Sequence, residues 1–162
     1  MPRYKITIEY DGRPFAGWQR QNDQPSVQQA LEEAAAKLDG APVQVQGAGR
    51  TDSGVHAAGQ VAHLDLQKDM PAEKVGDAIN YHLKPHPVAI LAAERMHDDF
   101  HARFDATERH YLYRISNRRA PLTLDHGFAW RVGMKLDAEA MHAAAQALVG
   151  HHDFSTFRDS QC

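Results

Sequence analysis

Residues 47–57 read Gly-Ala-Gly-Arg-Thr-Asp-Ser-Gly-Val-His-Ala, with glycines on both sides of one arginine and one aspartate. Glycine loses more conformational freedom on folding than other residues, so this spacing indicates unusual backbone dihedral angles or the close approach of another group. The flanking stretches, 42–46 and 61–66, alternate apolar and polar residues as half-buried strands do. We therefore expect Asp52 on a tight loop between strands of a rigid scaffold, a common position for catalytic groups.

These glycines do not form a nucleotide-binding motif. Gly47-Ala48-Gly49 begins like a dinucleotide fingerprint, but Asp52 occupies the third glycine position and a strand pattern follows instead of a helix. The sequence contains no Gly-Lys-Ser or Gly-Lys-Thr, which excludes a P-loop. On local features alone, a hairpin with a surface ion pair between Arg50 and Asp52, worth little in stability, is as good a reading as a catalytic loop.

Residues 47–61 resemble the signature of the TruA-type tRNA pseudouridine synthases, with Asp52 in the place of the catalytic aspartate. Further segments resemble that family in the same order: 10–12, 15–21, 27–28, 100–104, 109–113 and 152–155. The resemblance implies an enzyme that isomerises uridine to pseudouridine without a cofactor. It implies tRNA as the substrate, modified on the 3′ side of the anticodon arm at about positions 38–40.

The composition sets limits on the class of protein. At 162 residues and 43% hydrophobic, the chain suffices for one or two small domains with a sizeable core. Its formal net charge of −3 does not indicate a nucleic-acid-binding protein, although an acidic protein can still contain a local basic cleft. Cys162 is the single cysteine, and no apolar run reaches membrane-spanning length. We expect a cytoplasmic protein without a membrane segment.

Eleven histidines raise the question of a metal site. They are scattered, and no His-Glu-x-x-His motif or Cys/His cluster joins them. We therefore expect no metal site, and we assign the histidines to capping, packing and surface solvation.

The first two thirds of the chain alternate between strand and helix patterns. Strands are predicted at 3–10, 42–46, 61–66 and 88–92. One helix is predicted to begin after Ser26, with a capping box to Gln29, and to end at Gly40. A second helix is predicted to begin at Pro71. This order predicts an α+β fold of the ferredoxin-like, split βαβ kind, with an antiparallel sheet and both helices on one face. We assign residues 1–104 to this N-terminal domain.

Residues 105–162 carry a second, similar pattern that is incomplete. It predicts a strand over 106–116 with Tyr111 on one face, another at 128–132, and a helix from Asp137 to Gly150. The apolar stripe of that helix is Met141, Ala144, Ala145 and Leu148. By the resemblance, family members continue beyond this point. An unfinished half leaves a sheet edge and an apolar helix face exposed, so we expect a homodimer.

The loop after residue 10 carries cations and amides interleaved with aromatic side chains, a mixture that suits RNA. Trp18, Gln19 and Arg20 are the candidates for substrate binding in this loop. For Trp18 the competing reading, closure of the edge of the core, is the stronger one. Arg103 and Arg109 are further candidates for contacts with the RNA backbone.

The resemblance supplies two more catalytic candidates. Tyr111 matches the family's active-site tyrosine, which implies stacking on an extruded uracil and help in removing the proton from carbon 5. Without the resemblance, an ordinary strand aromatic is an equal reading. Arg50 either pairs with Asp52 or, as the resemblance implies, assists base extrusion. An RNA-binding module that has the fold but lacks turnover remains the alternative function.

Overall fold

The computed structural model describes residues 1–158, so Cys162 lies outside the described part of the chain. Two compact units are present, the first spanning Met1–Tyr111 and the second beginning at Leu112. The sequence predicts a domain boundary after residue 104, and this boundary stays a prediction.

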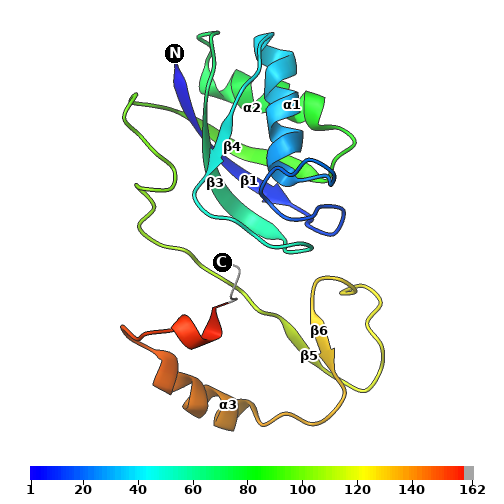
Figure 1. Ribbon diagram of the computed structural model, residues 1–162. Helices are drawn as coiled ribbons and strands as arrows, with labels where there is room; N and C mark the ends of the chain where they lie inside the picture. Colours follow the sequence, from blue (N-terminus) through cyan, green and yellow to red (C-terminus); the bar gives the residue numbers. More distant parts are fainter. Residues whose placement is uncertain (159–162) are drawn as a thin grey trace. The chain divides into compact units, whose positions relative to one another are not determined.

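The first unit is a four-stranded antiparallel sheet with two helices (Figure 1). Its elements are β1 (Arg3–Tyr10), α1 (Val27–Asp39), β2 (Val45–Gly47), β3 (Ala57–Asp65), α2 (Ala72–Leu83) and β4 (Val88–Met96). The strand order is β2-β3-β1-β4. This order, with α1 and α2 packed together over one face, is that of the split βαβ fold and confirms the predicted α+β class.

Strand β1 lies in the middle of the sheet and shows why the sequence alternates. Its residues Tyr4, Ile6 and Ile8 are completely buried beneath the helices, whereas the residues between them face the other side. The two neighbouring strands pair with it along its length, and β4 reaches Met96 opposite Arg3. Both neighbours are longer than predicted, because pairing with β1 extends them past their alternating stretches.

Helix α1 begins and ends where the sequence predicted. The hydroxyl of Ser26 accepts a hydrogen bond from the Gln29 amide at 3.2 Å, and Gly40 ends the helix in the left-handed conformation. The Gln29 side-chain NH2 group donates to the Glu33 carboxylate at 2.8 Å, and the structure shows no return bond from Gln29 to the Ser26 amide among residues 1–158. Helix α2 ends at Leu83, two residues before the first of two prolines.

The second unit contains β5 (Ile115–Asn117), β6 (Trp130–Val132) and α3 (Ala138–Ala145), followed by 3₁₀ turns at Gln146–Leu148 and Ser155–Phe157. Strands β5 and β6 pair in parallel. The predicted strand over 106–116 was wrong except at its last two residues. Within residues 1–158 no strand pairs with positions 105–114, and an extended segment without a hydrogen-bonded neighbour is not a β-strand.

Helix α3 is capped by the carboxylate of Asp137, which accepts from the Ala140 amide at 2.9 Å, as predicted. It ends at Ala145 and not at Gly150, and none of its residues is buried within the described chain. The predicted stripe therefore forms no core there. Among residues 1–158, no helix combines the length and the apolar character that crossing a membrane requires.

Candidate active site

The loop between β2 and β3 carries Asp52, as the flanking strand patterns predicted. Two hydrogen bonds join the start of this loop to β3. The Ala48 amide donates to the carbonyl of Val61 at 2.7 Å, and the Gln60 side-chain amide donates to the carbonyl of Gly49 at 2.6 Å. The loop therefore leaves the sheet in a fixed direction.

The segment between β1 and α1 braces the tip of this loop through main-chain hydrogen bonds. The Trp18 amide donates to the carbonyl of Thr51 at 2.9 Å, and the Gly54 amide donates to the carbonyl of Phe15 at 3.4 Å. These bonds lie on either side of Asp52 along the chain. They hold the backbone that carries the carboxylate without using the carboxylate itself.

Gly17 permits this close approach. Its φ of 108° lies in the left-handed region, and a Cβ at this position would lie 2.6 Å from the carbonyl oxygen of Thr51. The hydroxyl of Thr51 also forms a 2.8 Å hydrogen bond with the phenol of Tyr10, at the end of β1. The Asp52 loop is thus fastened to the central strand as well as to the bracing segment.

The Asp52 side chain is exposed, and within residues 1–158 its carboxylate makes no hydrogen bond or ion pair. Arg50 is also exposed and does not pair with it. The simple reading of this loop as a hairpin with a surface Arg50–Asp52 ion pair is therefore wrong. Both charged groups are available for an external partner.

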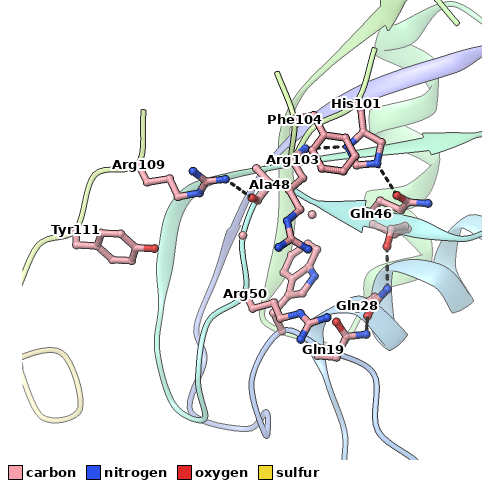
Figure 2. Close-up of a pocket in the computed structure, with 14 residues that line it drawn as sticks. Gln19, Gln28, Gln46, Ala48, Arg50, His101, Arg103, Phe104, Arg109 and Tyr111 are labelled. Carbon is pink, nitrogen blue, oxygen red and sulfur yellow. Dashed lines mark hydrogen bonds between the residues drawn. The ribbon is translucent and has the colours of Figure 1, made fainter. Parts of the chain in front are cut away.

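A pocket of about 620 Å³ lies beside the loop (Figure 2), within the range of about 300–1,000 Å³ typical of small-ligand sites. Three arginines line it, and each comes from a different part of the chain: Arg50 from the loop, Arg103 from the turn after β4, and Arg109 from the segment that follows. No aspartate or glutamate is among the 14 lining residues. The pocket is therefore locally positive in a protein of net charge −3.

The structure brings six of the eight predicted site residues to this pocket and leaves out two. The six are Trp18, Gln19, Arg50, Arg103, Arg109 and Tyr111. Asp52 does not line it, although it lies two positions after Arg50. Arg20 lies elsewhere, and its guanidinium forms a 2.8 Å ion pair with Glu32 on α1.

Trp18 belongs mainly to the core, which confirms the interpretation that it closes the edge of the core. Its side chain is only 2% exposed, and its ring lies 6.1 Å from that of Tyr10. A Cβ at Gly47 would come within 2.7 Å of the indole, so the glycine at the end of β2 leaves room for the ring. Gln19 is fixed beside it, since its amide donates to Gln28 at 2.9 Å.

Arg109 ties the segment that carries Tyr111 to the Asp52 loop (Figure 2). One guanidinium nitrogen donates to the carbonyl of Ala48 at 2.9 Å, and the side chain packs beside Gly49. Tyr111 itself is 78% exposed and, contrary to prediction, does not lie on a strand. Its position depends on this tether and not on a sheet.

Sequence reasoning missed His101 and Phe104, which also line the pocket. Their rings lie 4.3 Å apart and are tilted by only 32°, and Phe104 is 78% exposed. The sequence carried a usable signal, because an aromatic residue directly after an arginine in a polar loop is typical of RNA-binding surfaces.

The loop that carries these two rings is anchored by a buried histidine. His63 on β3 accepts a hydrogen bond from the Ala102 amide at 3.2 Å, and its ring lies 4.7 Å from that of His101. Burial lowers the pKa of His63, and the nearby positive charge of Arg3 lowers it further. The neutral ring is the form that accepts this hydrogen bond. Within residues 1–158 no cluster of histidine, cysteine and carboxylate side chains is arranged to hold a metal ion.

The sheet, the braced loop and the turn after β4 all lie within a stretch with known counterparts. A family model described as tRNA pseudouridine synthase matches residues 6–105. The chain belongs to this family. The match includes Arg50, Asp52 and Arg103 and ends before Arg109 and Tyr111, so the roles of the last two depend on geometry and resemblance.

Individual members of the tRNA pseudouridine synthase family are similar over all 162 residues. The chain is 75% identical to a tRNA pseudouridine synthase A of Maricaulis maris, 63% identical to one of Hyphomonas neptunium and 61% identical to one of Afipia carboxidovorans. It spans 65%, 65% and 66% of their respective lengths. The resemblance that the sequence showed around Asp52 is thereby confirmed at the level of the family.

Proposed function

We propose that this protein isomerises uridine to pseudouridine in tRNA, with Asp52 as the catalytic carboxylate. The observation that carries the proposal is the braced loop. It presents an unpaired carboxylate two positions after Arg50, which lines a pocket with three arginines and no acidic residue. Such a pocket attracts the phosphates of RNA, while the rigid loop holds one reactive group at its edge.

The chemistry needs one carboxylate and no cofactor. The bond between C1′ of the ribose and N1 of uracil breaks, the base rotates, and a new bond joins C1′ to carbon 5. Carbon 5 then loses its proton, and N1 gains one. Ionised Asp52 either attacks the sugar or the base, or removes a proton from the sugar. Tyr111 is the proposed group that receives the proton from carbon 5.

The target uracil has to leave its stack before it can meet Asp52, at a cost of about a few kcal/mol. Stacking on an aromatic ring returns about 1–3 kcal/mol per base, and Tyr111 is the proposed partner. Arg50 projects into the pocket from the same loop as Asp52 and assists the extrusion. The proposed substrate region is the 3′ side of the anticodon arm, at about positions 38–40.

The remaining candidates contact the RNA around this base. Arg103 and Arg109 face the pocket and reach phosphates, and Gln19 and the edge of Trp18 lie on its wall. Arg20 contacts phosphate from outside the pocket. Its side chain is 52% exposed while paired with Glu32, so it can bind a phosphate without leaving that partner. Each cation that contacts phosphate adds to the salt dependence of binding.

A second function, RNA binding without turnover, is favoured by one observation. Asp52 does not line the pocket, and within residues 1–158 no cation pairs with its carboxylate. A complete catalytic site would need a cation from outside residues 1–158 to pair with Asp52. The two functions share the basic pocket and differ only in whether the carboxylate reacts.

Release of tritium from tRNA labelled at carbon 5 of uridine separates the two functions. We expect release by the protein and a loss of about 10²–10⁴-fold in Asp52→Asn. Asp77→Asn is the matched control, because Asp77 is an exposed carboxylate on α2 away from the pocket. Salt-sensitive tRNA binding without release supports the binding module. Undiminished release from Asp52→Asn rules out the proposed mechanism.

Association and location also remain proposals. We propose a homodimer on the basis of large apolar side chains left exposed in the second unit, such as Leu112 at 85% and Leu124 at 96%. Light scattering coupled to size-exclusion chromatography tests this, and a monomer mass at micromolar concentration contradicts it. A cytoplasmic location, where tRNA is found, is proposed with the enzyme function.

A further inference from the structure

We propose that Phe104, stacked on His101, is a platform that binds a second unpaired nucleobase of the RNA, distinct from the uracil that reacts. The inference rests on the proposed function in that it takes RNA as the ligand. It assigns to this pocket a residue and a task that the chemistry at Asp52 does not require.

Phe104 stands out within its own loop. Phe100 and Ala102 are buried against the sheet, and the loop has thereby already placed its apolar anchors. Phe104 remains 78% exposed although it is a large apolar side chain. Single exposed apolar residues are common, so exposure alone proves nothing. The support beneath the ring and the charges around it make this one specific.

The support is the imidazole of His101, and it is fixed at both nitrogens. Its Nδ1 accepts a hydrogen bond from the Arg103 amide at 3.2 Å, so its Nε2 carries the proton and donates to the Gln46 side-chain oxygen at 2.9 Å. The two rings lie 4.3 Å apart in a nearly stacked arrangement. His101 thus covers one side of Phe104, and the ring keeps most of its surface open.

The loop itself is held rigidly in place. The guanidinium of Arg3 donates to the carbonyls of Asp98 and Phe100 at 2.7 and 2.8 Å, and His63 accepts from the Ala102 amide. A platform that is already ordered loses little conformational entropy when a base stacks on it. The aromatic surface is therefore prepared before the ligand arrives.

The charges around the platform suit a nucleotide. Arg50 and Arg103 line the same pocket as Phe104, and no carboxylate does (Figure 2). Positive groups beside an aromatic face match a phosphate joined to a base, the pairing that single-stranded RNA offers. Figure 2 shows the rings of Phe104 and Tyr111 on separate parts of the pocket lining, so a base stacked on Phe104 is distinct from the uracil assigned to Tyr111. A base inside a continuous helix cannot reach the ring, so the platform favours RNA that is unpaired beside its target.

Binding of an unmodified tRNA transcript tests the platform without any need for turnover. Phe104→Ala should weaken binding about 5- to 150-fold, the loss expected for one stacked base. Phe104→Trp should keep or increase the affinity, whereas Phe104→Leu should bind as weakly as the alanine variant. Tyr81→Ala is the matched control, because Tyr81 is 72% exposed on α2 outside the pocket, and its loss should leave binding unchanged.

The salt dependence distinguishes stacking from charge. Phe104→Ala should leave the slope of log affinity against log salt unchanged, and Arg103→Ala should reduce it by about one. Equal affinity of Phe104→Ala and the unaltered protein overturns the platform, as does full recovery by Phe104→Leu. Failure of tritium release with these affinity differences intact overturns the proposed enzyme but keeps the platform. Absence of tRNA binding overturns both.

Discussion

The phenol oxygen of Tyr10 lies 2.8 Å from the hydroxyl oxygen of Thr51, the residue immediately before Asp52. Tyr10 is the last residue of β1 and is 4% exposed. Burial raises the pKa of its phenol, and the hydroxyl therefore stays protonated at neutral pH. The central strand of the sheet and the proposed catalytic loop are thus joined by a side-chain hydrogen bond in addition to the main-chain brace.

Tyr10→Phe removes this hydrogen bond and keeps the ring. We expect the free energy of unfolding to fall by about 1 kcal/mol. Tritium release should slow while tRNA affinity stays the same, because Tyr10 contacts the loop and does not line the pocket. A double-mutant cycle with Thr51→Val checks the coupling, since the second substitution should cost little in the Tyr10→Phe background. Additive losses contradict the pairing.

Gly17→Ala should disturb the loop more than an alanine at another left-handed glycine. The added methyl would lie 2.6 Å from the carbonyl oxygen of Thr51, whereas at Gly40, where φ is 84°, no atom lies within 4 Å. We expect Gly40→Ala to cost about 1 kcal/mol in the free energy of unfolding, the penalty for the backbone conformation alone. Gly17→Ala should cost clearly more and abolish tritium release. Urea unfolding measures the free energy of unfolding of both variants. Equal losses would contradict the prediction and show that the Asp52 loop can shift to make room for the methyl group.

His63 should make the protein less stable in mild acid. Its folded-state pKa lies below 6.5, so the unfolded chain binds the proton more readily. The stability that the neutral ring contributes is complete above about pH 6.5 and declines as the pH falls from there toward the folded pKa. His63→Asn keeps an acceptor for the Ala102 amide and should flatten this decline. Urea midpoints from pH 8 to pH 5 test it, with exposed His151→Asn as the control. If the stability of His63→Asn falls with pH as steeply as that of the unaltered protein, another group causes the loss of stability in mild acid.

The Arg3–Asp65 pair should contribute in a lower pH window. Two guanidinium nitrogens of Arg3 donate to the two carboxylate oxygens of Asp65 at 2.8 and 2.7 Å, and these hydrogen bonds hold the pKa of Asp65 below 3.8. Since the folded-state pKa is depressed, the contribution is complete above about pH 4 and is lost as the pH falls through the folded pKa.

Asp65→Asn should therefore lower the free energy of unfolding by about 1 kcal/mol at pH 7, a modest value because the pair is partly exposed. The gap between variant and unaltered protein should narrow as the pH is lowered toward 3, where the carboxyl of Asp65 begins to take up a proton. Denaturant titrations at the two pH values measure the gap. A gap of constant size means that Arg3 stabilises the sheet by packing and not by charge.

The sequence predicted the first unit well because its signals are local. Alternation in β1 arises from burial of one face, and the ends of α1 are set by Ser26 and Gly40. The predicted strand around Tyr111 was wrong for the opposite reason. A strand exists only through a partner, and the composition of residues 106–114 cannot tell whether the chain supplies one.

The pocket was predicted as a set of residues but not as an arrangement. Arg103 and Arg109 come to the same pocket as the loop through contacts between distant parts of the chain, such as the hydrogen bond from Arg109 to Ala48. The pairing of Arg20 with Glu32 likewise depends on how α1 is rotated over the sheet, which no local pattern encodes. Phe104 was overlooked because an aromatic residue in a loop is usually an anchor, and only the structure shows that Phe100 already fills that place.

The main-chain hydrogen bonds of Phe15 and Trp18 with the Asp52 loop join two stretches that the pairing of β1 with β3 brings together. A nascent or partly unfolded chain contains every reactive side chain and yet lacks the geometry that displays them. The proposed reaction at Asp52 therefore requires a completed sheet, and a chain in which β1 and β3 have not paired should not modify RNA.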